Sequence, residues 1–163
     1  MEYVLIGKIV NTHGIKGELR IKSDFLIKER VFKKGMSYYI GKDKILEKVA
    51  SYRHHKDFEM VCFEGYDNIN QVLKYLKSNV YVKKDDLCLK DDEYILEELI
   101  GFQVIENEEV LGKIQEIMYN SSNVLLYVKA EKNFYIPNNS HFIKKVDMLK
   151  KEVIVENTKG LIL

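Results

Sequence analysis

The sequence has 163 residues, of which 46% are hydrophobic and 31% charged, and its formal net charge at pH 7 is +1. This balance is typical of a soluble globular protein and excludes a disordered tail, and the length suits one ordinary domain or two small ones. No apolar run approaches the roughly 20 residues that a membrane helix needs, and the N-terminal run MEYVLIGKIV carries an acid where a secretory signal would carry lysines. We therefore expect a cytoplasmic protein that does not enter a membrane.

The first half of the chain is predicted to be mainly β-strand. Residues 18–22 alternate strictly, with Leu19 and Ile21 on one face and the charged residues on the other. Glycines and polar turns separate three further β-rich runs, which are residues 37–40, 45–52 and 58–63. Short strands at this spacing predict a small closed barrel, which leaves no exposed sheet edge.

One helix is predicted in this half. Asp67 and Asn68 offer an N-cap, and Gln71 follows Asn68 at the spacing of a capping box. Apolar residues then recur at helical spacing and predict one core-facing stripe, formed by Ile69, Val72, Leu73 and Leu76. Residues 80–82 predict a strand that returns the chain to the barrel.

A charge-dense stretch, KKDDLCLKDDE at residues 83–93, marks a domain boundary. We divide the chain into a first domain at 1–84, a linker at 85–93 and a second domain at 94–163. The second domain has four strand candidates separated by turns at 107–109, 120–123 and 131–133, and these strands are residues 102–105, 110–118, 124–128 and 134–136. Such a meander has about the right length for a second small barrel, so the predicted fold is mostly β, with two small β-barrels and one short helix in the first domain.

The small net charge hides an asymmetry. Residues 1–84 contain 17 Lys and Arg against 10 Asp and Glu, a net +7, whereas residues 85–163 contain 9 against 15, a net −6. The arginines all lie in the first 53 residues, and arginine suits bidentate contacts with phosphate. The basic half is consistent with a nucleic-acid partner or, equally simply, with a solvated basic surface.

The two cysteines, Cys62 and Cys88, predict neither a disulfide framework nor a metal site. Structural zinc needs about four Cys or His ligands in close pairs, and neither cysteine has such a neighbour. His54 and His55 are adjacent, so on a strand they point to opposite faces. We expect structural thiols, no metal and no cofactor.

The stretch NTHGIKGELR at residues 11–20 places a histidine beside two glycines and an acid. A catalytic role for His13 needs a nucleophile or carboxylate held against it, and no GxSxG, HExxH or phosphate-binding glycine motif is present. A structural role explains more of these residues, because Gly14 and Gly17 allow the positive φ with which a chain reverses between two strands. Glu18 can then pair with a cation or with His13, while Lys16, Arg20 and Lys22 project from one rim.

The longer stretch IGKIVNTHGIKGELRIKS resembles the N-terminal signature of the ribosome maturation factor RimM family. That signature, G-x-[IV]-x-x-x-H-G-[ILV]-x-G-E, is matched by Gly7, Ile9, His13, Gly14, Ile15, Gly17 and Glu18. The likeness continues through most of the chain, in YLKSNVYVKKDDL, DDEYILEELIGFQVIENEEVLGKIQEIM, FYIPNN and KKVDMLKKEVIVENTKGLIL.

The resemblance implies an N-terminal barrel like those of translation factors, followed by a PRC barrel. It also implies a non-enzymatic assembly factor, acting as a monomer, that binds the head of the small (30S) ribosomal subunit through the nineteenth small-subunit ribosomal protein. Such a factor assists the folding and processing of 16S rRNA. The family usually carries two adjacent aromatic residues that are linked to ribosome binding. The corresponding residues here are Tyr94 and Ile95, so only one aromatic residue remains.

These considerations give two sets of candidate residues. Partner binding is assigned to Tyr94 and Ile95, and RNA phosphate contacts to Lys16, Arg20, Lys22, Lys33, Lys34 and Arg53. His13, Gly14, Gly17 and Glu18 are assigned to structure. Two alternatives stay open: a general RNA-binding barrel module in translation, and an rRNA-processing enzyme that uses His13 and Glu18.

Overall fold

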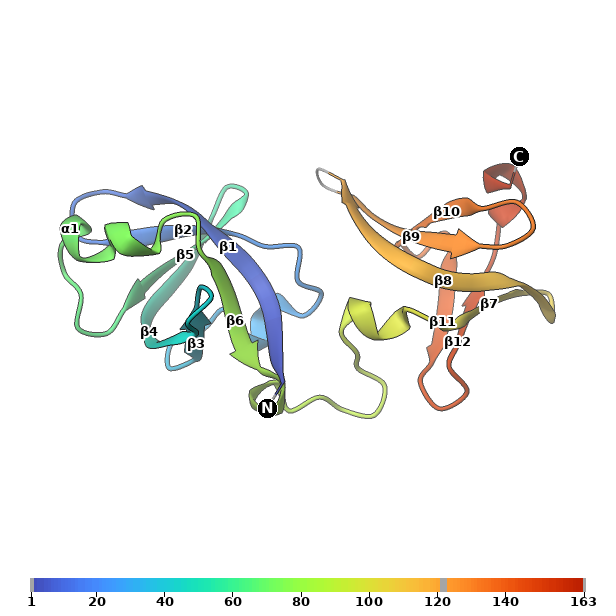
Figure 1. The fold of residues 1–163 in the computed structure, drawn as a ribbon, viewed down its shortest axis with the longest axis horizontal. Coiled ribbons are helices and arrows are strands. Elements are labelled where there is room, and N and C mark those ends of the chain that lie inside the picture. The colour runs from blue at the N-terminus through green and yellow to red at the C-terminus, as the bar shows by residue number, and fades with distance from the viewer. Residues whose placement is uncertain (1, 121–122, 163) are drawn as a thin grey trace. The chain divides into compact units, whose positions relative to one another are not determined.

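A computed structural model describes residues 2–120 and 123–162, and the chain divides into two compact units, Met1–Cys88 and Leu89–Leu163 (Figure 1). The predicted linker at 85–93 spans this division. The first unit is a closed barrel with strand order β1-β2-β5-β4-β3-β6. Its strands are β1 (Tyr3–His13), β2 (Glu18–Lys22), β3 (Ser37–Ile40), β4 (Ile45–His55), β5 (Phe58–Phe63) and β6 (Asn79–Lys83).

The barrel closes because β6 pairs antiparallel with both β1 and β3. Tyr81 of β6 lies opposite Leu5 on one side and opposite Tyr39 on the other. Every second side chain enters the interior, as the buried pairs Leu19 with Ile21 and Tyr38 with Ile40 illustrate. The predicted barrel and its returning strand are therefore confirmed.

The predicted helix exists but is shorter than its apolar pattern indicated. The α-helix α1 covers Ile69–Val72 and continues as a 3₁₀ turn over Leu73–Tyr75. The capping box is confirmed, because the Gln71 side chain accepts from the Asn68 backbone N–H at 3.1 Å while the Asn68 side chain caps the first turn.

The predicted core stripe is wrong at Leu73, which is 45% exposed. A 3₁₀ turn has three residues per turn, so the residue placed on the same face as Val72 is Tyr75. Both Val72 and Tyr75 are buried. The change from α to 3₁₀ geometry thus replaces one predicted core residue with another.

The second unit contains a six-stranded sheet with the order β10-β9-β8-β7-β12-β11. The strands are β7 (Gln103–Glu106), β8 (Glu109–Asn120), β9 (Asn123–Lys129), β10 (Phe134–Pro137), β11 (Ile143–Asp147) and β12 (Glu152–Val155). The predicted meander is confirmed for β7 to β10, although Glu109 belongs to β8 rather than to the preceding turn. Part of the predicted turn at 120–123, residues 121–122, lies outside the described residues.

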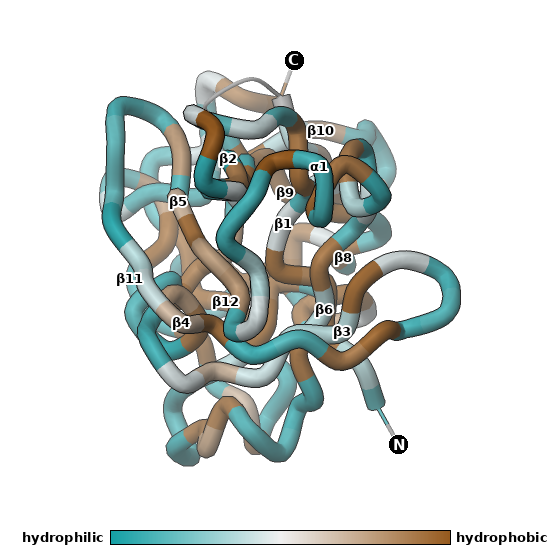
Figure 2. Tube along the Cα trace, turned by 90° about the vertical axis from the view of Figure 1, so that its left-hand side faces the viewer, coloured by the Kyte–Doolittle hydropathy of each residue, from teal (hydrophilic) through white to brown (hydrophobic). Residues whose placement is uncertain are grey.

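The last two strands extend the meander on its other side, because β12 pairs parallel with β7. Apolar side chains from five of the strands and from the 3₁₀ helix Leu96–Leu99 form one core, which includes Leu99, Val104, Leu126, Ile136 and Val153. Within each unit, apolar residues concentrate on the strands and polar residues on the connecting loops (Figure 2). In the described stretches, 2–120 and 123–162, no helix has the length and apolar character needed to span a membrane.

Candidate nucleic-acid and partner-binding site

The turn between β1 and β2 is built around two glycines with positive φ. Gly14 has φ +74° and Gly17 has φ +93°, and the strands they join bring His13 opposite Glu18. The turn also contacts the start of α1, where the Ile69 N–H donates to the Ile15 carbonyl at 2.8 Å. A Cβ at Gly17 would lie 3.2 Å from the Asn68 carbonyl oxygen, so a side chain at this position would press on the helix N-cap.

Polar side chains of β1, β2 and β4 gather beside this turn. Arg53 donates from Nε and Nη2 to the two carboxylate oxygens of Glu18, both at 2.8 Å. Arg20 Nη2 lies 2.7 Å from His13 Nδ1, and its guanidinium lies 5.6 Å from the centre of the Phe58 ring. We call His13, Glu18, Arg20, Arg53 and His55 the turn cluster.

Glu18 compensates one of the two arginine charges in the turn cluster, that of Arg53. The bidentate hydrogen bonds from Arg53 hold the pKa of Glu18 below its ordinary value, despite partial burial. Desolvation, with the positive charge of Arg53 adding to it, lowers the pKa of His55, whose ring lies 5.8 Å from that of His13. His13 and Glu18, the two groups suggested as an acid–base pair, are thus each hydrogen-bonded to an arginine side chain, Arg20 and Arg53 respectively.

Removing the Arg53 guanidinium tests this electrostatic account. We expect Arg53→Ala to raise the pKa of Glu18 toward its ordinary range, because the strongest hydrogen bonds to the charged carboxylate disappear. Side-chain carboxyl NMR shifts followed through an acid titration measure the change. Lys56→Ala on the following turn is the control, and an unchanged Glu18 pKa in the Arg53 variant would contradict the assignment.

The predicted phosphate-contacting residues do not form one group. Lys16 lies in the turn and Lys22 at the end of β2, both exposed. Lys33 and Lys34 are exposed in the loop before β3, and no interaction within the described stretches joins them to the turn cluster. Only Arg20 and Arg53 come together, since both lie opposite the buried Met60 in neighbouring strand pairs.

The predicted partner-binding pair precedes the 3₁₀ helix Leu96–Leu99 in the second unit. Tyr94 is half-buried and packs against the core, and burial raises the pKa of its hydroxyl. Ile95 is only 6% exposed. The accessible surface at this position is therefore supplied by Tyr94 rather than by an exposed apolar pair.

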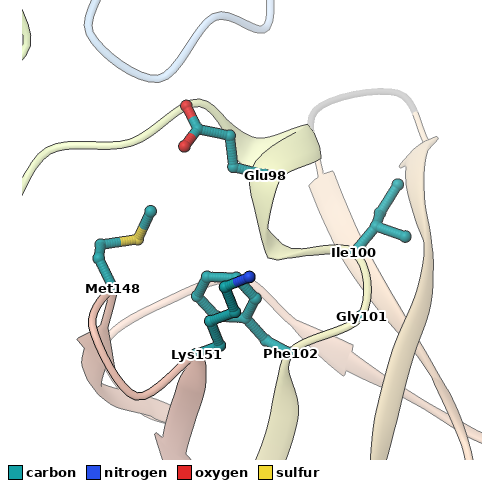
Figure 3. Close-up of a pocket in the computed structure, with 6 residues that line it drawn as sticks. All are labelled: Glu98, Ile100, Gly101, Phe102, Met148 and Lys151. Carbon is teal, nitrogen blue, oxygen red and sulfur yellow. The ribbon is translucent and has the colours of Figure 1, made fainter.

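The structure also reveals a pocket of about 440 Å³ in the second unit that the sequence did not suggest (Figure 3). The loop that joins β11 to β12 meets the end of the Leu96–Leu99 helix there, and the Gln103 N–H donates to the Lys151 carbonyl at 3.1 Å. The lining residues are Glu98, Ile100, Gly101, Phe102, Met148 and Lys151. The mixture of one acid, one base and apolar groups has no metal-binding character, and the described residues contain no cluster of three metal-ligating side chains.

The chain is a two-domain β protein. Its first unit is a closed barrel that carries the turn cluster, and its second unit contains a six-stranded sheet. Residues 4–87 match the RimM N-terminal domain and residues 96–161 match the RimM PRC barrel domain. The ribosome maturation factor RimM of Bacillus anthracis is 37% identical over 165 residues, covering 96% of each chain. That of Staphylococcus haemolyticus is 35% identical over 164 residues, covering 98% of each chain.

A solved structure of the N-terminal domain of RimM from Thermus thermophilus is 17% identical and has a TM-score of 0.46, covering 53% of this chain and 95% of that one. The two domain matches and the full-length relatives show that the chain belongs to the RimM family of ribosome maturation factors. The predicted family and fold class are thereby confirmed.

Proposed function

We propose that the protein is a non-enzymatic, monomeric assembly factor of the cytoplasm that binds the head of the maturing small ribosomal subunit. In this proposal it assists the folding and processing of 16S rRNA, needs no cofactor and contacts the nineteenth small-subunit ribosomal protein. The observation that carries the proposal is the match of both units to the two RimM domains in their normal order. Relatives of nearly the same length carry the description ribosome maturation factor.

The division of charge supports two kinds of partner. The basic first unit suits rRNA phosphates, and the acidic second unit suits a basic ribosomal protein, because complementary charge speeds and orients encounter. Lys16, Lys22, Lys33 and Lys34 are exposed and are the preferred phosphate contacts. Arg20 and Arg53 would first have to leave His13 and Glu18.

The proposed action is thermodynamic. A factor that binds one conformation of the rRNA–protein head more tightly than the others shifts the population toward that conformation. His13 and Glu18 are each hydrogen-bonded to an arginine, which argues against the alternative of an rRNA-processing enzyme that uses those two residues.

Binding to purified ribosomal particles tests the proposal. We expect selective binding to free small subunits, and we expect Tyr94→Ala to weaken it about tenfold or more, as is typical of an aromatic residue at the centre of an interface. Tyr94→Phe keeps the ring that packs on the core and should bind like the wild type. Tyr135→Ala, which removes an exposed tyrosine elsewhere in the second unit, is the matched control.

The measurement uses small subunits, large subunits and whole ribosomes at two salt concentrations. Equal binding to every RNA-containing particle would favour a general RNA-binding module. Absence of binding to small subunits at low salt would overturn the proposal.

A further inference from the structure

One outer face of the first barrel carries exposed aromatic and aliphatic side chains that no feature discussed above uses. The strands β1, β6, β3 and β4 are consecutive in the barrel. Their pairing places Leu5 opposite Tyr81, Tyr81 opposite Tyr39, and Tyr39 opposite Leu46, so these four side chains form one row across the sheet. Leu5 is 52% and Leu46 58% exposed. We call this row, together with Tyr3, Lys44 and Lys83, the tyrosine face.

The tyrosine rings of this face are paired with lysines and are partly accessible to solvent, since Tyr3 is 37% exposed and Tyr39 and Tyr81 are half-buried. The rings of Tyr3 and Tyr39 lie 5.2 Å apart at 59°. Lys44 Nζ lies 4.2 Å from the centre of the Tyr81 ring, and Lys83 Nζ lies 5.1 Å from that of Tyr39. Lys83 is also hydrogen-bonded to the Tyr39 side chain, which raises the pKa of its ammonium group.

The electrostatics of the tyrosine face favour an anionic ligand. The outward positions of β3 and β6 and of the adjoining parts of β1 and β4 all lie within the described residues, and none of them is a carboxylate. Lys48 lies opposite Ser37 in the next outward row and adds a further cation. The nearby acidic side chains lie at the margins of the face, where Asp43 precedes Lys44, Asp86 follows Lys83, and Glu2, before Tyr3, lies 3.6 Å from Lys84 Nζ.

A row of flat rings interleaved with cations is the surface that single-stranded nucleic acid recognises, because bases stack on aromatic side chains while phosphates meet lysines. A duplex keeps its bases stacked inside and offers them no ring faces. An acidic peptide would engage the lysines but would gain nothing from the tyrosine ring faces. Three strand spacings, about 14 Å in all, separate Leu5 from Leu46, which is enough room for about two or three nucleotides.

We propose that the tyrosine face binds an unpaired segment of RNA, with bases stacked on Tyr39 and Tyr81 and phosphates held by Lys44 and Lys83. On binding, a base takes the place of each ammonium group over its ring, and the displaced ammonium group meets the adjacent phosphate. The inference rests on the proposed function, in which maturing rRNA is the RNA concerned, and it specifies which form of that RNA the first barrel recognises.

A fluorescent single-stranded oligouridine and a duplex RNA of the same length test the proposal with the full-length protein. We expect tighter binding of the single strand, a loss of about tenfold or more in Tyr39→Ala/Tyr81→Ala, and near wild-type affinity in Tyr39→Phe/Tyr81→Phe. Lys44→Gln/Lys83→Gln should weaken binding and reduce its salt dependence, because fewer phosphates are neutralised. Tyr135→Ala, on the other unit, is the control for loss of an exposed tyrosine.

Wild-type affinity in the glutamine double variant, or in a folded alanine double variant, would overturn the proposal, as would equal binding of duplex and single strand. The glutamine variant leaves every ring in place, so it decides the question even where the alanine variant fails to fold. Tyr94→Ala should bind the oligouridine normally. If the protein binds small subunits but not oligouridine, this inference fails and the proposed function stands. If it binds oligouridine but not small subunits, the proposed function fails and the tyrosine face remains an RNA-binding surface.

Discussion

Replacing Gly112 with alanine is expected to destabilise the second unit by about 3 kcal/mol or more, among the largest effects of any single methyl group in the chain. A Cβ at Gly112 would lie 2.4 Å from the Lys129 carbonyl oxygen, 2.9 Å from Val128 Cγ1 and 3.0 Å from the Ala130 Cβ. The closest of these atoms belongs to the backbone of β9, so a rotamer change cannot relieve the clash. The strand β8 is also held on its other side by β7, where Gly112 lies opposite Val104. Either β8 or β9 must therefore shift within a paired sheet.

Denaturant unfolding of the full-length protein measures the effect, with hydrogen exchange assigning it to the second unit. Gly160→Ala is the matched control, because among the described residues no atom beyond its chain neighbours lies within 4 Å of its added Cβ. We expect the control to change stability by about 0.5 kcal/mol at most. Equal stability of the two variants would show that β8 and β9 accommodate the methyl group.

The strands of the first barrel were predicted well wherever burial alternates. The bounds of β2 and β3 coincide with their predicted runs, because an in–out period of two directly reports which face is buried. The bounds of β5 also coincide, although three consecutive residues of it are buried, because its β-rich run is flanked by turns. The strand β4 runs three residues beyond its prediction, to His55. Its polar end is stabilised by the buried carboxylate of Glu59, which lies 3.0 Å from His54 Nδ1, and that partner is not evident from local sequence.

Features that depend on partners distant in sequence were not predictable from local patterns. The parallel pairing of β12 with β7 joins segments separated by the whole meander. Residue patterns indicated that Glu18 would pair with a cation or with His13, but only the fold identifies Arg53, 35 positions away, as its partner. The tyrosine face was missed for the same reason, because its row is assembled from four strands of which only β3 and β4 are consecutive in the chain.

The sequence located candidate binding residues, but it did not show which of them are free to contact a ligand. Lys16, Lys22, Lys33 and Lys34 are exposed, as expected for cations on a barrel rim. Arg20 was predicted as a phosphate contact in the same way, yet it lies against His13 and Phe58, and its Nε is buried without a partner among the described residues. Exposure depends on packing across strands, which composition and charge do not report.

Alkaline pH is expected to destabilise the first barrel, through three tyrosines whose hydroxyls are hydrogen-bonded and buried or partly buried. Burial raises the pKa of Tyr38, whose hydroxyl donates to the Val31 carbonyl at 2.7 Å. Burial and a hydrogen bond to Glu59 raise the pKa of Tyr52 to about 12, from an ordinary value of 10.0. Burial, followed by a hydrogen bond to the carboxylate of Glu47, likewise raises the pKa of Tyr75.

A pKa that is higher in the folded than in the unfolded state gives stability that is complete below the unfolded value and is lost as pH rises toward the folded value. For these tyrosines the loss begins near pH 10, where the unfolded chain releases its phenolic protons while the folded chain keeps them. Between about pH 10 and about pH 11 the stability falls by about 1 kcal/mol for each of the buried tyrosines Tyr38 and Tyr75. Tyr52 is only partly buried and contributes less because solvent screens its interaction with Glu59, so the total loss is about 2 kcal/mol.

Urea unfolding at a series of pH values, with tyrosine ultraviolet absorbance to follow ionisation, measures this loss. Tyr38→Phe is the informative variant, because it cannot ionise at that position but keeps the ring that packs edge-on against Phe63 at 6.1 Å. We expect it to be less stable than the wild type at neutral pH, where it lacks the bond to Val31, and to lose less stability on going from about pH 10 to about pH 11. An identical alkaline loss in variant and wild type would mean that the Tyr38 hydroxyl ionises in the folded barrel, and its interior would then have to admit either water or a compensating cation.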